Sequence, residues 1–147
     1  MSNSKLSTSG FLTRLFKTAN LKQFIARNGD EFTDETFSDY INQLCGESNL
    51  SPSEVVKKTG IERTYGLQIF RGIRNPSRDK VILLAFGFGL DADGAQSLLR
   101  AAGKNALYPK IKRDAVILYC LEKKKTVVET QDMIYDLKLP LLGGDCS

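Results

Sequence analysis

The stretch that decides the fold is SPSEVVKKTGIERTYGLQIFRGIRNPSRDK, which covers residues 51–80. Its first residues predict the start of a helix, because Ser51 can cap it and Pro52 suits its first turn. Glu54, three residues after Ser51, completes a capping box. Gly60 predicts the end of this helix, since glycine readily adopts the left-handed conformation of a C-terminal cap.

A second helix is predicted almost at once, over residues 62–71, and Gly72 ends it. Two short helices joined by a tight turn that contains glycine are the sequence form of a helix-turn-helix. The segment Arg74-Asn75-Pro76-Ser77 that follows reads as a loop. Residues 51–77 therefore predict a helical pair that ends in a polar, basic loop.

The rest of the chain predicts further helices around this pair. Apolar residues recur at helical spacing from Phe37, and this helix is expected to stop near Gly46. No segment alternates between apolar and polar residues for long enough to be a strand, so the predicted fold class is all-α. The other expected helices cover residues 11–27 (as one amphipathic helix or two short ones), 78–88, 91–102, 112–124 and 126–138.

Three domains are expected. Residues 1–36 comprise an N-terminal tail, the amphipathic helix and an acidic linker that contains Asp30, Glu31, Asp34 and Glu35. Residues 37–103 comprise the helix-turn-helix domain, and residues 104–147 form a C-terminal helical hairpin extension with a loose tail.

A weak internal repeat links the two C-terminal helix pairs. Residues 77–107 align with 112–142 at a spacing of 35 residues and without a gap. Arg78-Asp79 then falls on Arg113-Asp114, and Gln96 falls on Gln131. Two stacked αα-hairpins would bury each other's apolar faces, although two amphipathic hairpins share apolar positions by construction. Either interpretation concerns packing rather than chemistry.

The composition argues against several functions. The 147 residues include no histidine, which removes the commonest general base and the commonest zinc ligand. Three widely separated cysteines, Cys45, Cys120 and Cys146, indicate neither a disulfide framework nor a thiolate metal site. We expect no enzyme activity, no cofactor and no metal. The sequence has no apolar run that could span a membrane and no recognisable signal peptide, so a cytoplasmic location is expected.

The charge is unevenly distributed along the chain. The formal net charge is only +4, but residues 57–80 contain seven lysines and arginines against two acids. A solvated basic surface would explain such a segment on its own. Combined with the predicted helix-turn-helix, it favours contact with DNA.

Residues 37–91 resemble the lambda-repressor-like helix-turn-helix family, which includes the xenobiotic-response-element-type bacterial regulators. The longer phrase RTYGLQIFRGIRNPSRDK, followed by Leu107-Tyr108-Pro109 and two further helices, resembles regulators of this family that carry a helical C-terminal extension. The resemblance is carried by Leu50-Ser51, Thr59-Gly60, Arg63-Thr64, Phe70-Arg71-Gly72, Arg74-Asn75-Pro76-Ser77 and Gly89-Leu90.

The resemblance implies a bacterial transcriptional regulator that binds double-stranded DNA, with helix 62–71 in the major groove. Arginine and glutamine side chains can make paired hydrogen bonds to base edges, whereas contacts to phosphates fix the register on the duplex. The implied base-contacting residues are Arg63, Thr64, Tyr65 and Gln68. The implied phosphate-contacting residues are Ser53, Arg71, Arg74 and Asn75.

Three positions depart from the family pattern. Pro52 stands where many relatives have a glutamine that touches phosphate, and Glu62 stands where a small cap is common. Gly66 stands where a β-branched residue usually fills the core, while the facing position in the family is often alanine and here is Val56. This exchange of large and small residues predicts that Val56 and Gly66 touch across the helix crossing.

The alternative function is a protein-interaction or adaptor module on a helix-turn-helix scaffold that no longer binds DNA. Pro52 and Glu62 favour this alternative, and the basic segment 57–80 favours DNA. The exposed face of the N-terminal helix or the C-terminal hairpin could serve a homodimer or another protein partner. The sequence does not identify the operator, the effector or the sign of regulation.

Overall fold

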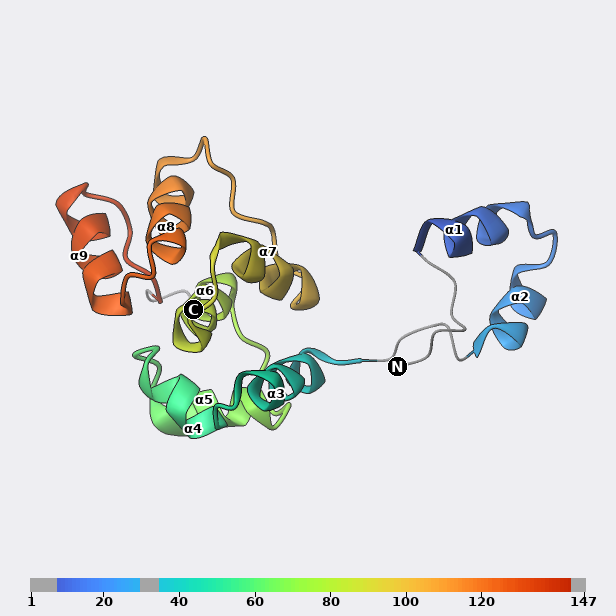
Figure 1. The fold of residues 1–147 in the computed structure, drawn as a ribbon, viewed down its shortest axis with the longest axis horizontal. Coiled ribbons are helices and arrows are strands. Elements are labelled where there is room, and N and C mark those ends of the chain that lie inside the picture. Colours follow the sequence, from blue (N-terminus) through green and yellow to red (C-terminus); the bar gives the residue numbers. More distant parts are fainter. Residues whose placement is uncertain (1–7, 30–34, 144–147) are drawn as a thin grey trace. The chain divides into compact units, whose positions relative to one another are not determined.

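The structure, a computed structural model, describes residues 8–29 and 35–143, and within these ranges it contains helices and no strands (Figure 1). The predicted all-α class is confirmed. The chain divides into two compact units, residues 1–35 and 36–147. None of the helices in the described ranges is long and apolar enough to cross a membrane.

The N-terminal unit contains α1 (Thr8–Lys17) and α2 (Leu21–Arg27), so the expected amphipathic segment forms two short helices. Asn20 starts the second helix because its side chain accepts a hydrogen bond from the N–H of Gln23 at 3.0 Å. The rings of Phe11 and Phe24 lie 5.4 Å apart and join the two helices. Most of the acidic linker, residues 30–34, lies outside the described residues, as does Cys146. The large apolar side chains of this unit that remain exposed are Leu12, Phe16, Leu21 and Ile25.

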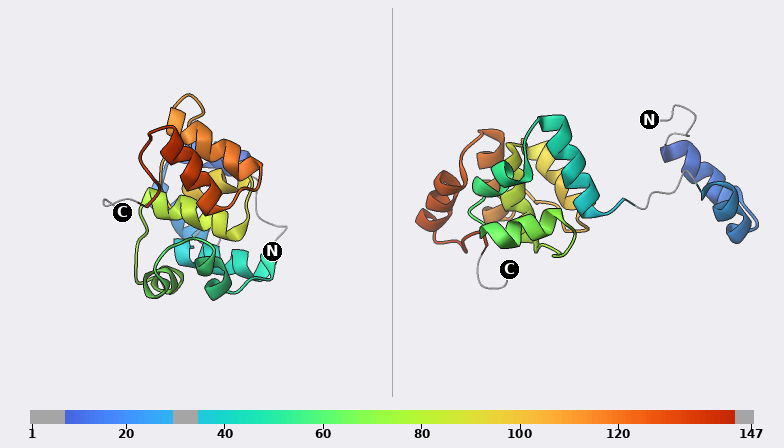
Figure 2. Two further views of the ribbon diagram at one scale, coloured as in Figure 1. Left: turned by 90° about the vertical axis from the view of Figure 1, so that its left-hand side faces the viewer. Right: turned by 90° about the horizontal axis from the view of Figure 1, so that it is seen from below.

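The C-terminal unit is organised around helix α6 (Arg78–Phe88), in which every residue from Val81 to Phe88 is buried. Figure 2 shows the helices of this unit from two further sides. The helix expected over residues 78–88 is confirmed. Helix α6 packs against α4 and α7, α5 packs against α3 and α4, and α8 packs against α7 and α9. The helices of this unit are α3 (Phe37–Ser48), α4 (Pro52–Lys57), α5 (Arg63–Phe70), α6 (Arg78–Phe88), α7 (Ala92–Ala101), α8 (Lys112–Glu122) and α9 (Val127–Asp136).

Helix α3 ends at Ser48, two residues beyond Gly46, near which it was expected to stop. Asn49 takes the left-handed conformation instead, with a φ of 58°, and the N–H of Leu50 bonds back to the carbonyl of Cys45 at 3.0 Å. Asparagine tolerates this conformation better than other residues with a side chain, so it can replace glycine at a helix end. A glycine in a helix interior costs only about 1 kcal/mol relative to alanine, so Gly46 weakens α3 without ending it.

Two glycines set the distance between the central helices. A Cβ atom on Gly66 would lie 2.5 Å from Val56 Cγ1, which confirms the predicted contact across the α4–α5 crossing. A Cβ atom on Gly87 would lie 2.7 Å from the backbone carbonyl oxygen of Val55. The valines of α4 therefore pack directly on the backbones of α5 and α6, and only glycine fits at either crossing without movement.

The internal repeat is confirmed by matched hydrogen bonds. Gln96 exchanges two hydrogen bonds with the backbone of Leu107, both of 2.8 Å, and Gln131 exchanges two of 2.9 Å with the backbone of Leu142. Both partners of one copy lie 35 residues before those of the other. In each copy a glutamine thus fixes the segment that follows its hairpin, which satisfies backbone groups that would otherwise be left unpaired.

The two hairpins are joined by ion pairs that exchange partners. Arg78 of the first hairpin binds Asp114 of the second, with an Nη2–Oδ2 distance of 3.0 Å. Arg113 of the second binds Asp79 of the first, with a distance of 2.8 Å. Each hairpin gives its arginine to the other hairpin and receives the other's in return, as in a pair related by a two-fold axis. In an open stack, each hairpin would instead give its arginine to the next hairpin in the row. The hairpins therefore form a closed pair rather than the first two steps of an open stack.

Each arginine of the exchange also holds a chain segment. Arg78 donates to the carbonyl oxygens of Asn105 and Ala106, both at 2.9 Å. Arg113 donates in the same way to Pro140 at 2.7 Å and to Leu141 at 2.9 Å. The two arginines thereby tie the ends of both hairpins to the first turns of α6 and α8.

We predict that Arg113→Ala lowers the free energy of unfolding by about 2–3 kcal/mol, because it removes a largely buried charged partner and four hydrogen bonds. Arg100→Ala is the control, since Arg100 is exposed in the last turn of α7, and it should change stability by less than about 0.5 kcal/mol. Urea denaturation measures both. Equal effects of the two substitutions would contradict the role given to Arg113.

The same variant has a predicted pH dependence. Burial raises the pKa of Asp79, but the hydrogen bonds and charge of Arg113 outweigh it and hold this pKa below its ordinary value. A lowered pKa adds stability that is present above the unfolded-state value, about 3.9, and is lost as pH falls through the folded-state value. The wild-type protein should therefore lose more stability than Arg113→Ala between about pH 6 and about pH 3. Parallel losses would contradict this assignment.

A mutant cycle tests the contact between Val56 and Gly66. Gly66→Ala should destabilise the protein by about 1–2 kcal/mol through overpacking, and Val56→Ala by about 2 kcal/mol through the gap it leaves. The double variant should recover part of this loss, because contacting residues couple. Gly46→Ala is the control: nothing lies within 4 Å of its Cβ position in α3, so it should stabilise by up to about 1 kcal/mol. Additive losses in the cycle would show that the two residues do not compete for space.

Candidate nucleic-acid interface

The α4–α5 pair is shaped by local hydrogen bonds that the sequence encodes. Ser51 accepts from the N–H of Glu54 at 3.1 Å, and the Glu54 carboxylate accepts from the N–H of Ser51 at 2.8 Å. This confirms the predicted capping box. Helix α4 ends at Lys57, before the predicted stop at Gly60, whose φ of 81° lies in the left-handed region.

Thr59 explains why the helix ends early. Its buried hydroxyl donates to the carbonyl of Val56 at 2.7 Å and accepts from the N–H of Ile61 at 3.0 Å. These bonds bridge the end of α4 and the start of the next turn, so the chain leaves the helix before Gly60. The result is a short rigid connection between α4 and α5.

Glu62 is the N-terminal cap of α5. Its carboxylate accepts from the backbone N–H of Thr64 at 3.0 Å and from that of Tyr65 at 2.9 Å. These hydrogen bonds lower the pKa of Glu62 below its ordinary value. A carboxylate already occupies the site where a phosphate would meet the helix N-terminus, so an anion approaching α5 must be bound by side chains.

The predicted base-contacting residues lie on the outer surface of α5. Arg63 and Thr64 are exposed in its first turn, and Tyr65 and Gln68 are half-buried. Within the described residues, no hydrogen bond or ion pair engages the Arg63 guanidinium. The Arg63 side chain is therefore available to an external partner, such as a guanine edge.

Tyr65, Gln68, Arg74 and Lys80 form a group that we call the Tyr65 cluster. Arg74 Nε donates to Gln68 Oε1 at 2.9 Å, and the Arg74 guanidinium carbon lies 5.1 Å from the centre of the Tyr65 ring. The ammonium of Lys80, from the first turn of α6, lies 5.1 Å from the same ring centre. Two cations are thus held over one aromatic ring beside α5, each by a cation–π contact.

The predicted phosphate-contacting residues, Ser53, Arg71, Arg74 and Asn75, are all exposed. Arg71 caps the end of α5, and Asn75 lies in the loop beyond it. Ser53 lies apart from them, in the first turn of α4. Of these four residues, Arg74 contacts two of the predicted base-contacting residues, Gln68 and Tyr65.

Two basic residues have roles that the sequence did not indicate. Arg78, counted with the basic segment, is committed to Asp114 and to backbone carbonyls, so its charge is not free for DNA. The sequence assigns no role in DNA contact to Lys80, yet this residue belongs to the Tyr65 cluster. The only sequence signal for Lys80 was its place in the basic segment, because its contact with Tyr65 depends on how α6 packs beside α5.

Among the described residues, no group of three or more cysteine, aspartate and glutamate side chains is placed to hold a metal ion. Cys45 and Cys120 are both buried, and burial raises the pKa of the Cys45 thiol, with a smaller contribution from the nearby charge of Glu54. A buried thiol with a raised pKa is a weak nucleophile. The functional groups on the surface of α5 are the carboxylate of Glu62 at its N-terminus and the cations, amide and aromatic ring around Tyr65.

No family model, curated protein or solved structure matches this chain.

Proposed function

We propose that α4 and α5 form a helix-turn-helix and that the protein binds double-stranded DNA as a bacterial transcriptional regulator. In this proposal α5 enters the major groove and α4 lies across the backbone. Two-fold operators require two protomers, so a homodimer would be the working form in the cytoplasm. The single observation that carries the proposal is the placement of cations around α5.

That placement suits a duplex. The eight residues of α5 rise about 1.5 Å each and so span about 12 Å, close to the width of the major groove. Arg63 begins the helix, Arg71 follows its last residue, and Arg74 and Lys80 are held over Tyr65 beside it. A guanidinium at the start of the helix can reach base edges, while cations at its far end and beside it can meet phosphates.

A salt-titrated binding assay with genomic duplex fragments tests the proposal. If Arg71, Arg74 and Lys80 each neutralise one phosphate, the logarithm of the binding constant should fall with the logarithm of salt concentration at a slope of about −3 per protomer. The electrostatic contribution is strongest at low salt. An absence of duplex binding at low salt would overturn the proposal.

The second candidate is a protein-interaction module. It is favoured by the exposed apolar side chains of the N-terminal unit, Leu12, Phe16, Leu21 and Ile25, and by the carboxylate of Glu62 at the start of α5. Apolar side chains that are left exposed together on one surface often mark a site of contact with a partner. A monodisperse protein that binds no duplex would favour this candidate.

Two arginines should respond differently to substitution if α5 is the recognition helix. Arg63→Ala should cost about 1–3 kcal/mol on the best site and relax the preference at one base pair, because it removes a base contact. Arg74→Ala should weaken binding to all sequences alike and reduce the salt slope by about one unit. Binding to a panel of single-base operator variants at several salt concentrations measures both effects.

The matched control is Arg100→Ala, which removes an exposed arginine from α7 rather than from the surface of α5. It should leave affinity, base preference and salt slope unchanged. Neither Arg63→Ala nor Arg74→Ala should lower the melting temperature appreciably, since both side chains are exposed. The assignment fails if Arg100→Ala weakens duplex binding as much as Arg63→Ala does.

A further inference from the structure

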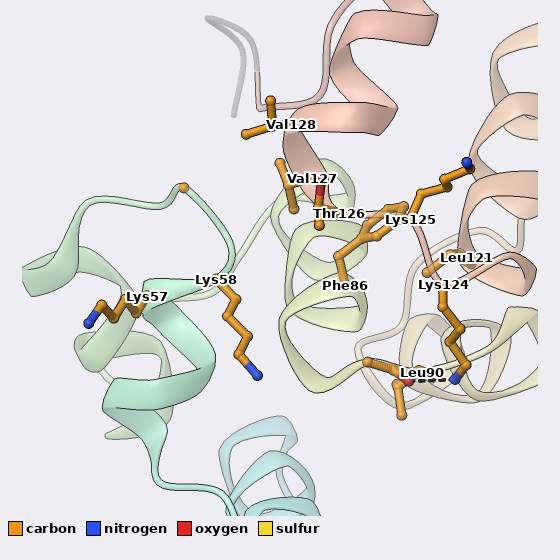
Figure 3. A pocket seen from close by; sticks show the side chains of 12 residues that line it. Lys57, Lys58, Phe86, Leu90, Leu121, Lys124, Lys125, Thr126, Val127 and Val128 are labelled. Atoms are coloured by element: carbon orange, nitrogen blue, oxygen red, sulfur yellow. Dashed lines mark hydrogen bonds between the residues drawn. The ribbon is translucent and has the colours of Figure 1, made fainter.

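A cavity of about 440 Å³ lies where α4, α6 and the α8–α9 connection meet (Figure 3). Its apolar surface comes from Phe86 and Leu90, at the end of α6, and from Leu121 and Val127, on either side of the α8–α9 turn. Cavities of this size, lined mainly by apolar side chains with a few polar groups, are typical sites for small molecules. None of the residues assigned to DNA lines this cavity, although its lining residues Lys57, Lys58 and Gly60 lie between Ser53 and Arg63 in the sequence.

The charged residues that line the cavity are all lysines. Lys57 and Lys58 follow one another at the end of α4, and Lys124 and Lys125 precede α9; none of the lining residues is acidic. Glu54, one turn earlier on α4, feels the charge of Lys58 but does not line the cavity. A ligand in this cavity therefore meets an apolar surface on which every charged lining side chain is positive.

Two of the four lysines are placed to act on a ligand. Figure 3 shows the Lys58 side chain extending toward the cavity side of α4, whereas the Lys57 side chain extends away from it. The Lys124 ammonium donates to the carbonyl of Gly89 at 2.7 Å and is thereby held at the cavity edge. The backbone of Lys124 adopts the left-handed conformation, with a φ of 58°, within the turn that joins α8 to α9.

We propose that this cavity binds a small organic anion with an apolar body, of the class of medium-chain carboxylates. The apolar surface favours burial of a hydrocarbon body, because burial removes apolar surface from water. An uncharged hydrocarbon would make no favourable contact with the ammonium groups of Lys58 and Lys124, and a cation would be repelled by them. An anionic head group complements both ammonium groups.

The position of the cavity gives binding a structural consequence. Helix α4 packs on α5 and α6, whereas α8 packs on α7 and α9, so the cavity lies between the α4–α5 pair and the C-terminal hairpin. A ligand there touches both parts and links them. Coupling of this ligand to DNA affinity would rest on the proposed function; the binding itself does not.

Calorimetric titration of the full-length protein with decanoate, below its micelle concentration and without DNA, tests the inference. One decanoate should bind per chain, and decyltrimethylammonium, a cation with the same hydrocarbon chain, should not bind. Because no duplex is present, failure here leaves the DNA proposal standing, and failure of DNA binding leaves this inference standing. Absence of decanoate binding, or equal binding of the cation, overturns the inference.

Three variants locate the site. Lys58→Gln should weaken decanoate binding about two- to fivefold, as expected for the loss of one exposed charge pair. Lys110→Gln is the matched control and should bind as the wild type does, because Lys110 is an exposed lysine that does not line the cavity. Val128→Asp places a negative charge at a lining residue that is 70% exposed, so it should weaken binding by a similar factor without unfolding the chain. Wild-type affinity in both Lys58→Gln and Val128→Asp would show that decanoate binds elsewhere.

Discussion

The exchanged ion pairs of Arg78 with Asp114 and of Arg113 with Asp79 are the interaction on which the C-terminal unit depends. They join the first turns of α6 and α8. Each carboxylate also accepts a backbone N–H from the segment after a hairpin: Asp114 from Tyr108 at 2.9 Å and Asp79 from Gly143 at 3.1 Å. Asp114 is only 3% exposed. Its buried charge is tolerated because Arg78 and the N–H of Tyr108 bind the carboxylate.

The ion pairs also bear on the candidate interface through α6. Arg78 and Asp79 fix the first turn of that helix, and the next residue, Lys80, lies over the ring of Tyr65. The close crossings at Gly66 and Gly87 hold α5 against α4, and α4 against α6. The ion pairs therefore fix the first turn of α6, and the two close crossings fix the distances between α4, α5 and α6. Together these contacts determine the position of the surface around α5.

Local features of this fold could be predicted from the sequence, because a helix cap is encoded within four residues. The capping box at Ser51 follows from such a short pattern, and helix α6 follows from the apolar residues between its cap and Gly89. The repeat of 35 residues follows from a comparison of two longer segments of the sequence. The commitment of Arg78 to Asp114 could not be predicted, since it joins residues 36 positions apart and depends on tertiary packing. For the candidate site, the exposure of Arg63 and Arg71 follows from the helical period, whereas the grouping of Tyr65 with Lys80 depends on how two helices pack. The cavity beside α4 has no sequence signal, because its lining comes from three separate segments.

The claim that α5 is the surface that meets DNA is tested most directly by amide chemical-shift mapping of the full-length protein with a duplex at low salt. The account predicts shifts concentrated in α5 and in the loop from Arg71 to Ser77, with α7 and α9 unchanged and with reversal when salt is added. Unchanged α5 amides in the presence of excess duplex, or shifts confined to α8 and α9, would contradict it.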